Sequence, residues 1–100
     1  MKYIVDQDSA GIVEDLRKHG YVCETATRLI LGHDDSRFRV GDPRIIAFLE
    51  KHRDEYTLLT GDDELVRDCT EAGLRVLRLP KPLPRFNEIR LLLSGAGAQS

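Results

Sequence analysis

The chain has 100 residues, a formal net charge of −2, and a composition that is 41% hydrophobic and 32% charged. This length suits one domain with a modest core, and the composition excludes an intrinsically disordered chain. No apolar run approaches the roughly 20 residues that cross a bilayer, so we expect no contact with membranes.

The first quarter of the chain predicts a strand, a helix and a second strand. Residues 3–5 form a β-branched and aromatic run that ends at Asp6, as buried strands do. Residues 9–19 carry one apolar stripe and are followed by Gly20, which predicts a helix and its end. Residues 21–25 predict the second strand, so a right-handed parallel crossover is expected.

Residues 26–41 are less regular, and we expect a short helix near residues 29–31 followed by a loop. Beyond them, helices and strands alternate. The predicted elements are a helix at 42–52, a strand at 56–60, a helix at 63–72, a strand at 75–79 and a helix at 85–93.

This alternation predicts an α/β fold, namely a three-layer α/β/α sandwich with a mainly parallel four-stranded sheet. Residues 1–93 are expected to form a single domain, and residues 94–100 a flexible C-terminal tail.

Aspartates fall at the strand ends where parallel sheets bind ligands. Asp6 follows the first strand and Asp62 follows the third. Asp42 opens the helix that leads into the third strand, so its first turn should lie on the same rim. Three carboxylates at one rim repel one another, and Mg²⁺ or Mn²⁺ would offset that repulsion. Asp8 and Asp63 are further candidate ligands.

A purely structural interpretation also fits these aspartates. Asp42 before Pro43 and Asp62 before Asp63 both occupy favourable N-cap positions. Asp6 directly ends a buried strand, where a capping role is less natural. The functional interpretation therefore depends on the three residues meeting in space.

Basic residues lie near the expected rim. Arg37, Arg39 and Arg44 are candidates for binding phosphate, and Phe38 is a candidate for stacking on a base. The alternative is a solvated loop in which Phe38 is buried and no ligand binds.

The acidic pattern resembles the PIN nuclease superfamily, and most closely its shortest bacterial and archaeal members. The resemblance covers about residues 2–80. Its motifs are a strand that ends Ile4-Val5-Asp6, a helix that begins Asp42-Pro43, a strand that runs Leu58-Leu59-Thr60-Gly61-Asp62, and Gly73-Leu74-Arg75-Val76.

The resemblance implies a magnesium- or manganese-dependent ribonuclease, as in the toxin of a toxin–antitoxin pair. In that case Asp6, Asp42 and Asp62 would be catalytic metal ligands, and Thr60 would support them. RNA, a small antitoxin protein and a second copy of the chain are the partners that it implies. The chain lacks the second acid of larger PIN enzymes, so a catalytically inactive binding or regulatory module is the alternative.

A response-regulator receiver domain is a second α/β alternative. Asp6, Asp8 and Lys81-Pro82 match some of its parts, but Asp62 follows Thr60 on one strand end where a receiver needs two different strands. The cysteines, Cys23 and Cys69, form no CxxC pair. Together with the absence of a signal peptide, they predict free thiols and a cytoplasmic location.

Overall fold

A four-stranded parallel sheet is the centre of the computed structural model, which describes residues 1–35, 37–80, 89–90 and 93. The strands are β1 (Lys2–Val5), β2 (Val22–Thr25), β3 (Tyr56–Thr60) and β4 (Val76–Arg78). Their order in the sheet is β2-β1-β3-β4, and all three pairings are parallel. The predicted α/β class with a parallel four-stranded sheet is therefore confirmed.

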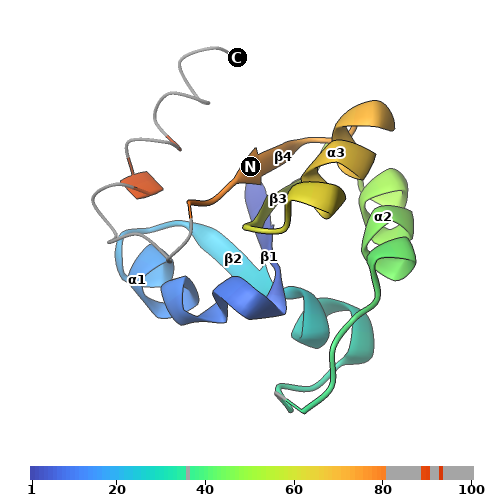
Figure 1. The fold of residues 1–100 in the computed structure, drawn as a ribbon. Coiled ribbons are helices and arrows are strands. Elements are labelled where there is room, and N and C mark those ends of the chain that lie inside the picture. Colours follow the sequence, from blue (N-terminus) through green and yellow to red (C-terminus); the bar gives the residue numbers. More distant parts are fainter. Residues whose placement is uncertain (36, 81–88, 91–92, 94–100) are drawn as a thin grey trace.

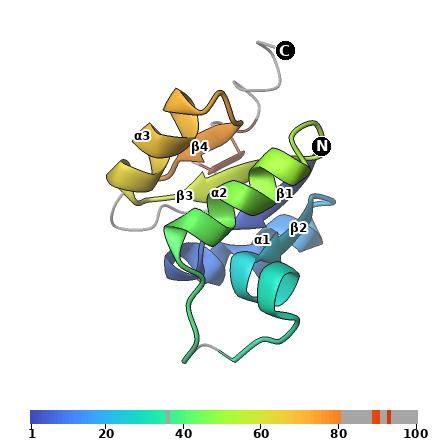
Figure 2. The ribbon, with the colours of Figure 1, turned by 90° about the vertical axis from the view of Figure 1, so that its right-hand side faces the viewer.

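Helices cover both faces of the sheet (Figure 1). One face packs Val5 and Leu59 against Leu16 of the helix α1 (Val13–Lys18) and against Ile89. The other face packs Ile4 and Leu58 against the helices α2 (Asp42–Lys51) and α3 (Asp63–Glu71). Figure 2 shows α2 in front of the sheet. Because side chains alternate between the two faces along each strand, the strands contribute to two separate hydrophobic cores.

Two helical segments differ in detail from the sequence prediction. The helix expected at 9–19 begins instead as a 3-10 turn, η1 (Gln7–Ile12), and becomes α-helical only at Val13. The short helix expected near 29–31 is a π-helical turn, η2 (Thr27–Leu31), which ends at Gly32 with φ of 82°. A positive φ of this kind favours glycine. No helix within the described ranges is long and apolar enough to cross a membrane.

The C-terminal predictions are only partly covered by the description. Residues 89, 90 and 93 of the helix predicted at 85–93 are helical, and Ile89 and Leu93 are buried. The remainder of that helix, Lys81-Pro82 and the predicted tail at 94–100 lie outside the described residues.

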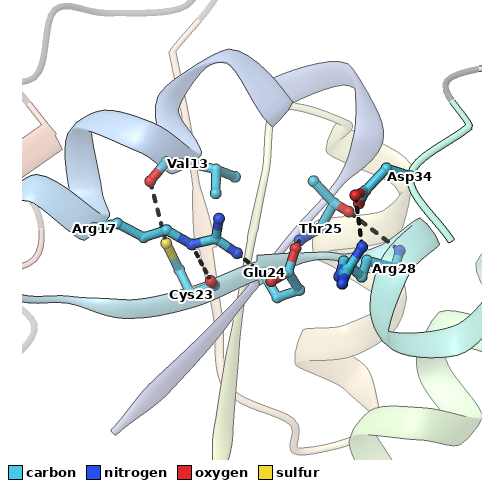
Figure 3. Close-up of polar contacts among 7 residues, drawn as sticks. All are labelled: Val13, Arg17, Cys23, Glu24, Thr25, Arg28 and Asp34. Carbon is cyan, nitrogen blue, oxygen red and sulfur yellow. Dashed lines mark hydrogen bonds and ion pairs between the residues drawn. The ribbon is translucent and has the colours of Figure 1, made fainter. Parts of the chain in front are cut away.

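Polar contacts cover the outer edge strand β2 (Figure 3). Arg17 of α1 donates from Nε to the carbonyl oxygen of Cys23 at 3.1 Å and pairs with Glu24. Beyond the strand, Arg28 pairs with Asp34 at 2.6 Å. Occupied backbone groups and charges discourage pairing of an edge strand with another chain.

The central strands should dominate stability. We expect Leu58→Ala to lower the free energy of unfolding by about 2–5 kcal/mol, because the side chain is fully buried in the core beneath α2 and α3. The matched control is Val22→Ala on β2, whose side chain is 60% exposed, and this change should cost less than about 1 kcal/mol. Urea denaturation of both variants provides the measurement, and equal losses would contradict this account of the core.

Candidate functional site

The strand order places a topological switch point between β1 and β3. From β1 the chain passes through α1 on one face to β2, and then through α2 on the other face to β3, on the opposite side of β1. Crevices of open α/β sheets form at the carboxyl ends of the strands where the direction reverses in this way. Asp6 follows β1, and Asp62 lies two residues after β3. The structure therefore brings these two predicted site residues to the position where the fold type binds ligands.

A buried threonine links the two strand ends. Thr60 is fully buried, and its hydroxyl donates to Oδ2 of Asp6 at 2.8 Å. The hydroxyl oxygen of Thr60 also accepts a hydrogen bond from the backbone N–H of Asp62 at 3.1 Å. One side chain thus fixes the Asp6 carboxylate and the turn that carries Asp62, which is the supporting position predicted for Thr60.

Asp62 has a clear structural role. It is the N-cap of α3, and its Oδ1 accepts the backbone N–H groups of Glu64 at 2.9 Å and Leu65 at 3.1 Å. The capping interpretation is confirmed for this residue. Its Oδ2 receives no hydrogen bond from the described residues, so one carboxylate oxygen is without a partner among them.

Asp42 has no such role. The N-cap of α2 is Gly41, Asp42 is the first helical residue, and the cap makes no side-chain hydrogen bond. The prediction that Asp42 caps this helix is therefore wrong. Within the described ranges, the side chain of Asp42 makes neither a hydrogen bond nor an ion pair. Its half-buried carboxylate consequently has both oxygens available.

The three carboxylates share one region of negative potential. Burial raises the pKa of Asp42 above its ordinary value, and the charges of Asp62 and Asp6 raise it further. Burial also raises the pKa of Asp6, with the Thr60 hydrogen bond opposing this shift and the charges of Asp8 and Asp62 adding to it. Asp6, Asp42 and Asp62 are thus close enough to repel one another.

The two additional predicted ligands lie in different surroundings. Asp8 is exposed and pairs with Arg39, which approaches from the loop before α2. Asp63 is also exposed and pairs with Arg78 of β4. Arginine thus neutralises these two carboxylates. Asp6, Asp42 and Asp62 form no ion pair with any described cationic side chain.

The three arginines predicted to bind phosphate differ in whether a carboxylate already pairs with them. Arg37 is 84% exposed and is held by Asp35 through several hydrogen bonds. Arg39 contacts Asp8. Arg44 lies in the first turn of α2, two residues from Asp42, and is exposed without a side-chain partner among the described residues. Among the three candidate arginines, Arg44 is thus the one whose guanidinium is not paired with a carboxylate of the described residues.

A hard divalent cation suits the chemistry of this site, because all candidate ligands are carboxylate oxygens. Within the part of the chain that the structure describes, no three His, Cys, Asp or Glu side chains lie close enough to hold one ion. Magnesium is commonly held by only one or two carboxylates, with water and substrate phosphate as its other ligands. Asp6 and Asp42 are the residues that could supply carboxylates to a site of that kind.

Sequence reasoning missed one residue that organises the surroundings. Thr27 of η2 is buried, and its hydroxyl lies 2.9 Å from Oε1 of Gln7 and 3.4 Å from the carbonyl oxygen of Phe38. It thereby joins the residue that follows Asp6 to the loop before α2. The residues in contact are 20 and 11 positions apart, and no local pattern in the sequence indicates such a contact.

Comparison with known proteins identifies no relative: no family model, no curated protein and no solved structure matches the chain.

Neutralising Asp42 should stabilise the protein near neutral pH. The raised pKa means that the ionised carboxylate costs stability above its folded-state pKa and costs nothing below the ordinary pKa. The helix dipole favours a negative charge at this position and reduces the expected gain. We therefore expect Asp42→Asn to raise the free energy of unfolding by less than about 1 kcal/mol, since solvent screens this partly exposed charge.

The measurement is thermal unfolding without metal across pH 3–8. The gain for Asp42→Asn should be present at pH 7 and disappear as the pH falls below about 4. Asp54→Asn is the control, because Asp54 is exposed in the turn before β3 at the other end of that strand. A loss of stability in Asp42→Asn at pH 7 would show that the carboxylate is stabilising after all.

Proposed function

We propose that the protein is a divalent-metal-dependent ribonuclease that hydrolyses phosphodiester bonds at the carboxyl ends of β1 and β3. The observation that carries the proposal is the set of three mutually repelling carboxylates, without a cationic partner among the described residues, at the switch point of the sheet. The PIN-like arrangement of acids in the sequence, with Asp6, Asp42 and Asp62 as its members, supports the same activity.

Each residue has a distinct task in this proposal. Asp6 and Asp42 hold Mg²⁺ or Mn²⁺, which supplies an activated water and neutralises charge on the phosphoryl group. Thr60 positions the Asp6 carboxylate through the 2.8 Å hydrogen bond. Asp62 adds negative potential while it caps α3. Arg44 binds a phosphate oxygen of the RNA, as guanidinium groups do.

A catalytically inactive binding or regulatory module is the second candidate. It is favoured by the absence, within the described ranges, of any three metal-ligating side chains that could hold one ion. The receiver-like alternative has less support. Strand β3 ends at Thr60, whose hydroxyl donates to Asp6, whereas a receiver requires a phosphoryl-accepting aspartate at such a strand end.

The biological setting follows from the same proposal. A toxin-type ribonuclease would act in the cytoplasm, bind a small antitoxin protein and form homodimers. These three points remain predictions.

Metal binding should be visible as stabilisation. A ligand that binds only the folded state at about ten times its Kd raises the free energy of unfolding by about 1.4 kcal/mol. We expect Mn²⁺ to raise the Tm of the wild-type protein by several degrees, and we expect Asp6→Asn and Asp42→Asn to lose most of that increase. Differential scanning fluorimetry with and without Mn²⁺ measures the effect, with Asp54→Asn as the control that retains it.

Cleavage separates the two candidate functions. The ribonuclease proposal requires Mn²⁺-dependent cleavage of a mixed-sequence RNA, reduced at least about 100-fold in Asp42→Asn if that carboxylate holds the catalytic ion. A protein that binds Mn²⁺ through Asp6 and Asp42 but cleaves no RNA would be the inactive module. If Mn²⁺ neither raises the Tm nor causes RNA cleavage, both the ribonuclease and an inactive module that binds Mn²⁺ would be refuted.

A further inference from the structure

We propose that Phe38 is a stacking platform for an unpaired base of the RNA, next to the phosphate that is cleaved. This inference rests on the proposed function, since it assigns the part of the substrate that the acidic site leaves unrecognised. It commits the protein to single-stranded RNA, because a base must be unstacked before an aromatic side chain can stack on it.

The ring of Phe38 is unusually accessible for its size. Among the described residues only Met1, Val22 and Phe38 are exposed large hydrophobic side chains, and Phe38 is 52% exposed. Its ring makes an edge-to-face contact with His33 at a centroid distance of 5.2 Å. This contact restrains the ring while leaving half of the residue open to solvent, as a stacking surface requires.

The backbone of Phe38 is tied to the strand end that carries Asp6. The buried Thr27 hydroxyl lies within hydrogen-bonding distance of both the Phe38 carbonyl oxygen and the side chain of Gln7. The next residue, Arg39, pairs with Asp8. Both contacts join the loop to residues directly after Asp6, and Figure 1 shows this loop beyond the carboxyl end of β1. The platform therefore lies beside the acidic site.

The two flanking arginines give the platform its charge. Arg37 and Arg39 have side chains that are 84% and 64% exposed, and each is paired with an exposed or half-exposed carboxylate. Such surface pairs contribute little free energy, so a phosphate can take the place of the carboxylate at low cost. An exposed aromatic residue with an exposed arginine on either side of it in the sequence is a combination suited to binding single-stranded nucleic acid. Exposure alone would not distinguish Phe38 from Val22, but Val22 has neither the charges nor the position.

A tryptophan placed at this position reports the stacking directly, because the chain contains no tryptophan. In Phe38→Trp, a short oligoadenylate added in EDTA should quench the indole emission, and inorganic polyphosphate, which has charge but no bases, should not. Val22→Trp is the matched control: its side chain is equally exposed but lies at the amino end of β2, and its emission should not change.

Affinity provides the second measurement. Loss of one stacked base should weaken oligoadenylate binding by Phe38→Ala about 5- to 150-fold, with polyphosphate binding unchanged. Phe38→Trp should bind as tightly as the wild type. A DNA oligonucleotide of the same length and base sequence tests whether the platform distinguishes deoxyribose from ribose. Tighter binding of DNA than of RNA would overturn the assignment to RNA.

The outcomes separate this inference from the proposed hydrolysis. If quenching and the affinity loss occur but Mn²⁺ produces no cleavage, the platform stands and the protein is a binding module. If Mn²⁺-dependent cleavage occurs with the same KM in Phe38→Ala and the wild type, and Phe38→Trp is not quenched, the hydrolysis stands and the platform is refuted. Failure of the wild-type protein to bind oligoadenylate would also refute the platform.

Discussion

The rest of this structure depends on the repulsion among Asp6, Asp42 and Asp62, which the fold prevents from relaxing. Strands β1 and β3 are paired with each other and buried on both faces, so Asp6 and the turn with Asp62 cannot move apart without disturbing two cores. Asp42 is fixed by α2, whose Ile45 and Leu49 are buried against the sheet. The negative potential is therefore a permanent property of the folded chain, and the cation proposed above would lower its cost.

The order of the strands explains why the charges meet at this place. In a sheet wound in one direction only, a helix would cross the end of each strand and fill the space beyond it. Here α1 and α2 cover opposite faces of the sheet, which places the ends of β1 and β3 at the switch point of the fold. The short contact through Thr60 then ties those two ends together. The strand order thus determines where the candidate site lies, and the aspartates determine its charge. Both features coincide at the carboxyl ends of β1 and β3.

Much of the fold could be predicted because it depends on local patterns. The runs that became β1, β2 and β3 are β-branched and apolar, and Gly20 and Gly73 end helices with positive φ, as glycine does. The 3-10 start of the first helix was missed because Ser9 and Gly11 are weak helix formers whose effect a search for periodicity ignores. The site was predicted only at the level of the shared rim. The pairing of Asp8 with Arg39 joins residues 31 positions apart, and nothing in the sequence distinguishes a neutralised aspartate from a free one.

The contrast between Asp62 and Asp42 bears most directly on function. Two aspartates at the start of two helices look alike in sequence, yet one accepts two backbone N–H groups and the other accepts none from the described residues. A chain selected only for well-capped helices would gain by a neutral residue at position 42, because the carboxylate there meets burial and four negative neighbours. Asp6 shows the complementary arrangement, since the Thr60 hydroxyl favours its ionised form against the same surroundings. The proposed cation site would account for both arrangements, because a divalent cation binds ionised carboxylates.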